Sequence, residues 1–382
     1  MADFRMRGQL SAIEDCRDYS IIAVAELNSD GERMKRLPRN PEKFEVLSLF
    51  TSVALKHGYR LGHADDVERF LRSMGDSLKS SHANDNMLHG KRVEALFAHV
   101  AGAMGKCHMV KVEDSGEIFV AGIPVQAPDY RLILDDRTQL LVEVKNCHGE
   151  AIGKPFVLKR EYFDKLERYA ELNSVPLKIA VFFSSWNRWC LLSRRAFREE
   201  HGYLVTTFPN AMAKSEMADI GDATLATLPE LRLELMADPN EAKRIGDDGR
   251  AIVTFRSSRL FCGGAEIKDA LDNRIAFHMM RHGDWSDSSE AIVENGKLLG
   301  VVLTARPKDP PEEQAFAMIG NLSSMISAAY AEYTVAGRRP VALDAPVDPE
   351  MFTLYIPVDH KSEALPLWRF TMQPNWDFTD SA

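Results

Sequence analysis

The first part of the chain has the spacing of apolar residues that is typical of helices. Residues 42–57 and 64–79 repeat apolar positions at helical intervals, which predicts two helices. The run at 18–27 (DYSIIAVAEL) predicts a short strand before them. Residues 80–86 (SSHANDN) are rich in turn formers, and Asn84 is a good candidate to cap a following helix.

The middle of the chain alternates between helical and strand periodicity. In residues 87–105 the apolar side chains fall on one side of a helix, and Glu94 lies at the edge of that apolar face. The elements that follow are predicted as strands at 117–125, 129–134 and 140–145, a helix at 158–173, and strands at 177–183 and 189–192. This alternation predicts an α/β domain in which helices cover a sheet.

Beyond residue 215 the pattern changes. Polar residues at 294–297 (ENGK) separate two apolar runs and predict a hairpin over 291–304. A long helix is predicted at 312–335 and a strand at 351–358. The predicted domains are therefore a mainly helical N-terminal region (1–82), an α/β domain (83–200) and a C-terminal α+β module (215–382).

The charge is distributed unevenly along the chain. The 382 residues carry 47 Lys and Arg against 56 Asp and Glu, a formal net charge of −9. By segment, the charge is −3 over 1–136, +4 over 137–200 and −10 over 201–382. Because the field that a ligand meets is local, we expect an anionic partner to bind the basic middle segment.

Cysteine usage and hydropathy limit the cellular context. The five cysteines are widely spread and form no C-x-x-C pair, so the sequence predicts neither a disulfide framework nor a zinc knuckle. The N-terminus lacks the apolar run of a signal peptide, and no stretch is long and apolar enough to cross a bilayer. We expect a soluble, cytoplasmic protein that does not bind membranes.

One group of residues in the α/β segment suggests metal chemistry. Pro128-Asp129 opens one predicted strand, and after thirteen intervening residues the next strand brings Glu143-Val144-Lys145. Glu143 and Lys145 are two positions apart, so their side chains leave the same face of the strand, and Asp129 on the neighbouring strand can point into the same space. Two carboxylates are suitable ligands for Mg²⁺, and a lysine beside them can hold a phosphate. The alternative is that these residues form the solvated face of an ordinary hairpin.

Other copies of the tripeptide lack this setting. Glu241-Ala242-Lys243, Glu266-Ile267-Lys268 and Asp359-His360-Lys361 have no Pro-Asp pair on a plausible strand before them. Only the copy at 143–145 lies in an apolar strand that a short turn connects to a Pro-Asp strand.

Residues 87–195 resemble the PD-(D/E)XK nuclease superfamily, and within it the Holliday-junction-resolvase-like and RecB-like branches. The resemblance rests on the PD…ExK spacing, on the predicted order of elements and on Lys165-Leu166-Glu167-Arg168-Tyr169, which is similar to a Gln-Leu-x-x-Tyr motif in the second helix of such families. It implies a restriction-endonuclease-like α-β-β-β-α-β core. In this sequence Lys replaces the Gln of the motif.

The resemblance also implies roles for individual residues. Asp129, Glu143 and the Val144 carbonyl would be metal ligands, Lys145 would activate water or phosphate, and Glu94 would be a supporting ligand. The implied cofactor is Mg²⁺, with Mn²⁺ as a substitute. The predicted substrate-binding residues are Lys159, Arg160, Lys165 and Arg168.

Simpler roles are open for several of these positions. Glu94 could be a plain carboxylate at a helix edge, and Lys165 and Arg168 could pair with acidic neighbours on the same helix. We expect Tyr162 and Tyr169 to pack the helix against the sheet rather than to stack on bases. His148 is expected to be a loop histidine.

The function that the resemblance implies is a metal-dependent phosphodiesterase acting on nucleic acid, foremost a DNA endonuclease in restriction or phage defence. The alternatives are a non-catalytic scaffold that binds nucleic acid or protein through the same fold, and a nuclease that acts on RNA. A homo-oligomer such as a dimer is expected, and the acidic module at 215–382 is a candidate for binding a protein partner.

Overall fold

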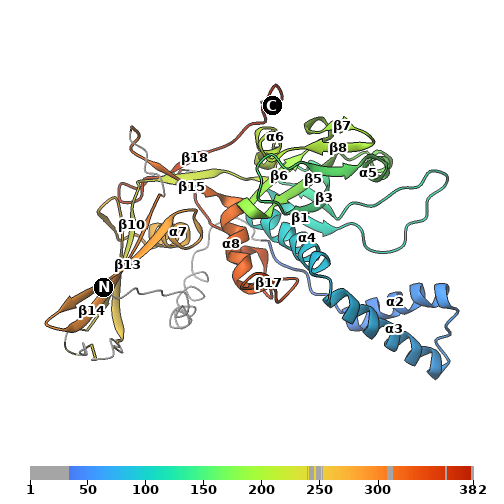
Figure 1. The fold of residues 1–382 in the computed structure, drawn as a ribbon, viewed down its shortest axis with the longest axis horizontal. Coiled ribbons are helices and arrows are strands. Elements are labelled where there is room, and N and C mark those ends of the chain that lie inside the picture. Colours follow the sequence, from blue (N-terminus) through green and yellow to red (C-terminus); the bar gives the residue numbers. More distant parts are fainter. Residues whose placement is uncertain are drawn as a thin grey trace. The chain divides into compact units, whose positions relative to one another are not determined.

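A five-stranded mixed sheet with helices on both faces is the centre of this α/β structure (Figure 1). The computed structural model describes residues 34–238, 240, 245–246, 251, 253–307, 313–357 and 359–379. The strand predicted at 18–27 lies outside these residues. Residues 34–382 group into one compact unit. The predicted division at 1–82, 83–200 and 215–382 stays a prediction.

The central sheet has the strand order β1-β2-β3-β5-β6. Its strands are β1 (Cys107–Val112), β2 (Tyr130–Leu134), β3 (Gln139–Cys147), β5 (Leu177–Phe183) and β6 (Arg188–Leu192). All neighbours are antiparallel except β3 and β5, which run parallel and are joined across helix α5 (Arg160–Asn173). The strand β3 is therefore central, with backbone partners on both sides.

Two separate hydrophobic cores cover the two faces of this sheet. On one face, helix α4 (Asp85–Ala103) packs Leu96 and Phe97 against strand residues that include Val142 and Val144. On the other face, α5 packs Phe163 and Leu166 against residues of β5 and β6. The alternation of side chains along each strand produces this two-sided burial.

The N-terminal helices follow the predicted pattern. The structure has α2 (Pro41–His57), α3 (Ala64–His82) and α4, close to the predicted bounds. Asn84 caps α4, because its side chain accepts a hydrogen bond from the Met87 amide at 3.1 Å. The helices α2 and α3 form a helical hairpin in which Phe50 and Phe70 are buried together, with ring centroids 5.1 Å apart.

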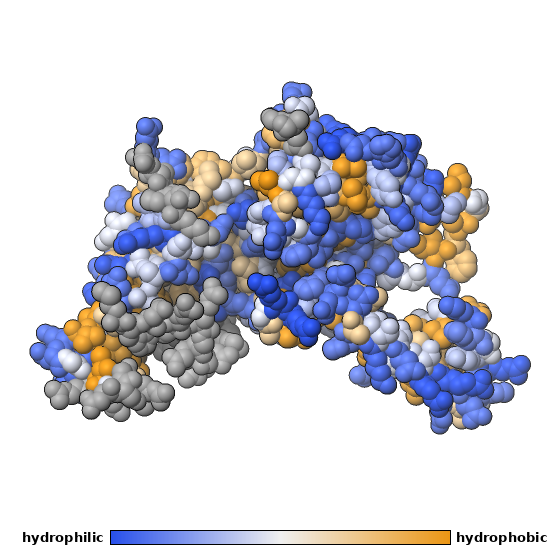
Figure 2. Space-filling model, in the orientation of Figure 1, coloured by the Kyte–Doolittle hydropathy of each residue, from blue (hydrophilic) through white to orange (hydrophobic). Residues whose placement is uncertain are grey.

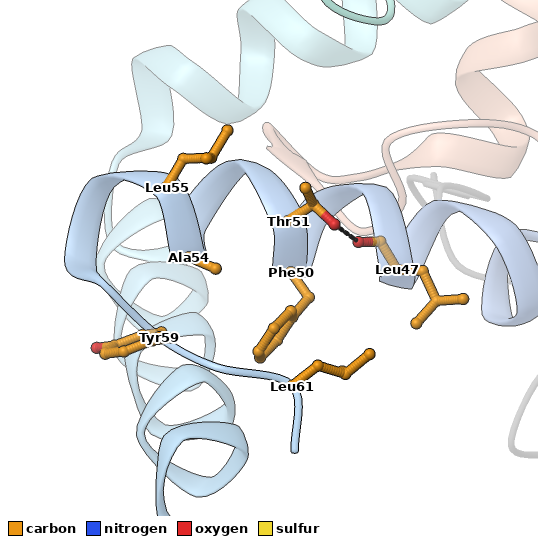
Figure 3. Close-up of a pocket in the computed structure, with 7 residues that line it drawn as sticks. All are labelled: Leu47, Phe50, Thr51, Ala54, Leu55, Tyr59 and Leu61. Carbon is orange, nitrogen blue, oxygen red and sulfur yellow. Dashed lines mark hydrogen bonds between the residues drawn. The ribbon is translucent and has the colours of Figure 1, made fainter. Parts of the chain in front are cut away.

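A shallow apolar pocket of about 200 Å³ lies on this hairpin (Figure 3). It is lined by Leu47, Phe50, Thr51, Ala54, Leu55, Tyr59 and Leu61. Apart from the hydroxyl groups of Thr51 and Tyr59, the lining offers only apolar side chains, so the pocket lacks the chemistry of an active site.

The remaining strands form smaller sheets. One has the order β12-β11-β10-β14-β13, and the others are β15-β9-β18, β4-β8-β7 and β16-β17. Their bounds are β4 (Phe156–Lys159), β7 (Arg198–Glu200), β8 (Tyr203–Thr206), β9 (Thr224–Thr227), β10 (Leu231–Ala237), β11 (Phe255–Cys262), β12 (Ala265–Ile267), β13 (Ser286–Glu294), β14 (Lys297–Arg306), β15 (Ala317–Asn321), β16 (Val335–Ala336), β17 (Arg339–Pro340) and β18 (Trp368–Phe370). The other helices are α6 (Phe208–Ala213), α7 (Ala270–His282) and α8 (Leu322–Thr334).

Helix α8 connects two cores. Ile326 and Tyr330 pack with α4 over the central sheet, whereas Leu322 and Met325 pack with α7 in a third core. Part of the predicted module at 215–382 thus contributes to the core over the central sheet.

The predicted strand at 117–125 is wrong. The first strand of the sheet is β1, which ends five residues before the predicted strand begins, and residues 113–129 form the connection to β2 (Figure 1). The apolar residues of this connection do not enter the sheet, because the antiparallel pairing that β2 requires is already made by β1.

The helix predicted at 312–335 is partly wrong, and the strand predicted at 351–358 is wrong. Ala317–Asn321 is a strand paired with β9, and Gly320 adopts φ 138°, so the helix begins only at Leu322. Pro349–Phe352 is a single 3₁₀ turn, and residues 353–357, which the structure describes, form no strand. Phe352 is instead buried individually against Tyr330 of α8.

The predicted hairpin is confirmed as β13–β14. Asn295 and Gly296 form its turn, both with positive φ (51° and 72°), as a two-residue turn requires. Among the described residues, no helix is long and apolar enough to span a membrane.

Candidate active site

The sheet brings the three residues of the PD…ExK pattern together. Glu143 and Lys145 lie on β3, and Asp129 directly precedes β2. Because Val142 and Val144 face the α4 core, the alternation of the strand turns Glu143 and Lys145 toward α5. Glu143 is 2% exposed and Asp129 is 9% exposed. Both carboxylates are therefore buried in the middle of the sheet rather than displayed on a solvated hairpin.

Asp129 is fixed by the backbone of the neighbouring strand. The β2–β3 ladder extends only to Tyr130, which lies opposite Val142. Beyond this pair, the Val144 amide donates to Asp129 Oδ2 at 2.7 Å. Where β2 ends, the Asp129 carboxylate thus accepts the hydrogen bond that a backbone carbonyl of β2 would otherwise accept. This hydrogen bond orients Asp129 toward β3.

Glu143 has two side-chain donors. Lys145 Nζ donates to Glu143 Oε1, and Tyr162 of α5 donates its hydroxyl to the same oxygen at 2.5 Å. Lys145 Nζ also donates to the Val144 carbonyl at 3.2 Å and lies 5.3 Å from the centroid of the Tyr162 ring. The ammonium group therefore contacts two of the predicted metal ligands.

The buried carboxylates repel each other. Burial, and next the charge of Glu143, raise the pKa of Asp129 to about 7, with a further contribution from Glu94. A cation between the carboxylates would relieve this repulsion, and two carboxylates with a backbone carbonyl are the oxygen donors that Mg²⁺ prefers. The donor chemistry of Asp129, Glu143 and Val144 therefore fits a hard divalent cation.

Glu94 approaches this pair from the other face of the sheet. It lies on α4, where Lys91 Nζ donates to Glu94 Oε2 at 2.5 Å, and its backbone carbonyl accepts from the Tyr130 hydroxyl at 3.0 Å. Within the described part of the chain, no group of three or more His, Cys, Asp or Glu side chains is placed to hold a metal ion. The role of Glu94 as a supporting ligand stays a prediction.

The predicted substrate-binding residues lie at the end of β4 (Lys159) and along α5 (Arg160, Lys165 and Arg168), and most have partners within the protein. Arg160 forms ion pairs with Glu199 and Asp164, and Lys165 pairs with Glu161 at 2.7 Å. The sequence left open whether Lys165 contacts substrate or pairs with an acidic residue of its own helix. In the structure it forms the ion pair on its own helix.

The other two substrate-binding candidates differ from each other. Arg168 donates from Nε to the Pro124 carbonyl at 3.1 Å rather than to an acidic neighbour on its helix. Lys159 is exposed at the end of β4. Lys159 is thus accessible to a phosphate from solvent.

The comparisons with known proteins give little support for a family. No protein-family model matches the chain, and no curated protein sequence matches it. Among solved structures, the chain is similar to Hjc, a Holliday junction resolvase from the archaeal hyperthermophile Archaeoglobus fulgidus. The two are 19% identical, the match covers 25% of this chain and 78% of that chain, and the TM-score is 0.20. A likeness of this size carries no argument, so the function has to be inferred from the residues themselves.

Two residues gain a role that the sequence did not predict. Tyr162 and Tyr169 pack against the cores on the α5 side, as expected, but each also donates its hydroxyl to a buried carboxylate, Glu143 and Glu113 respectively. Their spacing of seven residues on one helix face was the available indication. His148 lies just past β3, is exposed and is 3.0 Å from Ser184 Oγ, as expected of a loop histidine.

Lys91 is a further residue near the site for which the sequence predicted no role. Burial alone would lower its pKa, but the hydrogen bond with Glu94 and the charges of Asp114 and Asp129 raise it above the ordinary value. Lys91 thus adds positive charge next to the carboxylates. Its position three residues before Glu94 on a helix was visible in the sequence.

Proposed function

We propose that this chain is a metal-dependent phosphodiesterase that cleaves nucleic acid, with DNA preferred to RNA. One observation carries the proposal: two carboxylates, Asp129 and Glu143, are buried where β2 ends beside β3, and the ammonium group of Lys145 donates to Glu143. Buried acidic residues that repel each other are costly to the fold, and this cost is expected where a cation binds.

The order of elements supports the same proposal. From α4 through β1, β2 and β3 to α5 and β5, the chain follows the α-β-β-β-α-β order of a restriction-endonuclease-like core, with the short strand β4 added before α5. We propose this core topology for residues 83–200. The positions of Asp129 and Glu143 at its centre are those expected for the catalytic carboxylates of such a core.

Each residue has a defined task in the proposed reaction. Asp129, Glu143 and the Val144 carbonyl would hold Mg²⁺, or Mn²⁺ in its place. The bound cation would lower the pKa of a water molecule and neutralise charge on the phosphodiester. Lys145 would donate a hydrogen bond to a phosphodiester oxygen, and Tyr162 would keep Glu143 in place. Lys159 would contact a neighbouring phosphate, which positions the substrate without reading its sequence.

The test compares two E-x-K tripeptides of the same chain. In the full-length protein with Mg²⁺, Glu143→Gln and Lys145→Ala are expected to abolish cleavage of plasmid DNA. The matched variants Glu266→Gln and Lys268→Ala alter an ion pair on the surface, 3.9 Å long, and are expected to leave cleavage unchanged. Asp129→Asn serves as a third active-site variant, and thermal unfolding of each variant shows whether it is folded.

Two outcomes would contradict the proposal. Cleavage that survives all three active-site substitutions would come from another site or a contaminant. Cleavage of RNA but not of DNA with identical sequence would keep the reaction and change the substrate, since the 2′-hydroxyl is what separates the two.

A non-catalytic scaffold that binds nucleic acid is the second candidate function, and one observation favours it. Lys145 already neutralises Glu143 and contacts the Val144 carbonyl, so these ligands are satisfied without a metal ion. Under this function, the protein would bind DNA without cleaving it, and Mg²⁺ would leave its melting temperature unchanged.

A further inference from the structure

The connection between β1 and β2 carries a cluster of exposed apolar side chains. Phe119 is 91% exposed, the highest fraction recorded for a large apolar side chain in the described chain, and Ile123 is 61% exposed. Ile118 and Val120 are about half exposed. We call residues 118–125 (IFVAGIPV) the apolar loop. It is the long teal loop that extends to the right in Figure 1, and its orange surface is visible at the same edge in Figure 2.

Hydrogen bonds tie the end of the apolar loop to α5. The Gln126 amide donates to the Lys165 carbonyl at 3.1 Å, and Arg168 Nε donates to the Pro124 carbonyl at 3.1 Å. Ala127 and Pro128 are then buried and lead directly to Asp129. The loop is therefore anchored beside the candidate active site, on the α5 side to which Glu143 and Lys145 also point.

The apolar loop offers no group that binds phosphate. Residues 118–128 contain no charged side chain, and the residues just before them, Asp114 and Glu117, are acidic. What the loop presents is an aromatic ring flanked by branched aliphatic side chains. On a nucleic acid, the apolar surfaces that such side chains fit are the faces of the bases, and these become accessible where neighbouring bases are parted.

Clustering makes this surface different from ordinary exposed residues. Single apolar side chains on a protein surface are common, but a cluster on a projecting loop next to a catalytic carboxylate usually serves binding. The apolar loop leads directly into Asp129. A substrate bound at Asp129 would therefore lie beside this loop. Position and chemistry together therefore point to the bases of the substrate as the occupant.

We propose that the apolar loop enters the nucleic acid between neighbouring bases, with Phe119 stacked on a base, while the phosphodiester lies at Asp129 and Glu143. The inference rests on the proposed nuclease function and adds a substrate class to it. Nucleic acid whose bases part easily, such as a duplex with a bulge, is the substrate, in preference to a fully stacked duplex. The apolar loop supplies the energy of stacking, and Lys159 supplies a phosphate contact.

The test uses the full-length protein and two DNA duplexes that contain 2-aminopurine, a base whose emission rises when it is unstacked. One duplex is fully paired and the other has a three-nucleotide bulge next to the probe. Binding is measured in EDTA, so that the DNA stays intact. The variants are Phe119→Ala, the conservative Phe119→Trp, and Leu172→Ala as a control, because Leu172 is an exposed apolar residue (69%) on α5 outside the loop.

The expected result has three parts. The wild-type protein and Phe119→Trp raise the emission of the bulged duplex, and Leu172→Ala behaves like the wild type. Phe119→Ala abolishes the rise and weakens binding of the bulged duplex about tenfold or more, as the loss of one base–aromatic stack implies. Its binding of the paired duplex changes little.

Other results would overturn the inference. They are an absent rise with the wild-type protein, a Phe119→Ala variant that binds and reports like the wild type, or a changed sedimentation coefficient of Phe119→Ala without DNA, which would make the loop a contact between protein chains. Cleavage with Mg²⁺ is measured separately. If the protein cleaves DNA but Phe119→Ala binds and reports like the wild type, the role of the apolar loop is refuted and the nuclease function stands. If the emission rises but no DNA is cleaved, the nuclease function is refuted and the base contact of the loop stands.

Discussion

Two tyrosines on α5 allow one hydroxyl group to be tested against another. Tyr162 donates to Glu143 at 2.5 Å, and Tyr169, seven residues later, donates to Glu113 at 2.8 Å. Burial, and next the charge of Glu143, raise the pKa of Tyr162, so its hydroxyl stays protonated and donates over the whole range of working pH. Tyr162→Phe and Tyr169→Phe each remove a single oxygen and keep the ring.

The two substitutions are expected to cost similar stability. A hydrogen bond to a charged group contributes about 1.5–3 kcal/mol. After the change, Glu143 keeps Lys145 as a partner and Glu113 keeps Arg131, so neither carboxylate is left alone. We therefore expect each variant to lower the free energy of unfolding by about 2 kcal/mol, measured by urea unfolding followed by circular dichroism.

The two substitutions are expected to differ in their effect on DNA cleavage. A residue that orients a metal ligand typically contributes about 10- to 100-fold to metal affinity or activity. Tyr162→Phe should therefore reduce cleavage at limiting Mg²⁺ by that factor, with part of the loss recovered at higher Mg²⁺. Tyr169→Phe should retain wild-type cleavage. If both variants show the same Mg²⁺ dependence, or if only Tyr169→Phe loses activity, Tyr162 does not position Glu143.

Three further predictions concern stability. Lys178 and Glu216 form an ion pair with both side chains nearly buried, so Lys178→Met should lower the free energy of unfolding by about 3–5 kcal/mol, and Glu216→Gln in the same chain should recover part of this loss in urea unfolding. Leu166 of α5 is fully buried, so Leu166→Ala should cost about 2–5 kcal/mol; a loss below 0.5 kcal/mol would contradict the packing of α5 on the sheet. Burial lowers the pKa values of His278 and His282 on α7 to about 3 and about 4, whereas the unfolded chain binds protons already below 6.5. Stability should therefore fall as the pH drops from 6.5 toward 4, by up to about 1.4 kcal/mol per pH unit for each histidine, and His278→Gln should reduce this slope in urea unfolding at several pH values.

The parts of the fold that rest on local pattern were predictable from the sequence. The helices α2, α3 and α4, the strands β2 and β3 and the β13–β14 turn at Asn295 and Gly296 follow from periodicity, capping and turn chemistry. These signals act between residues close in the chain, so a single sequence contains them.

The incorrect predictions of secondary structure concern segments whose conformation depends on residues distant in the sequence. Residues 117–125 have the composition of a strand, but β1 already occupies the place beside β2. Residues 317–321 have the composition of a helix, but they pair with β9 as a strand. Phe352 has a strand-like neighbourhood, but it is buried individually between α4 and α8. Apolar residues can be buried by any of these arrangements, so composition does not choose between them.

For the candidate site, the sequence by itself determined which residues share a strand face. The spacing of Glu143 and Lys145 fixes their common side, and the Pro-Asp pair marks the end of the neighbouring strand. The tertiary structure alone decided that Asp129 binds the Val144 amide, that Tyr162 holds Glu143, and that Arg160, Lys165 and Arg168 have partners within the protein. The reason is physical: a repeat of two residues places side chains on a face, whereas hydrogen bonds, burial and the resulting pKa of Asp129 depend on elements that only the folded chain brings together.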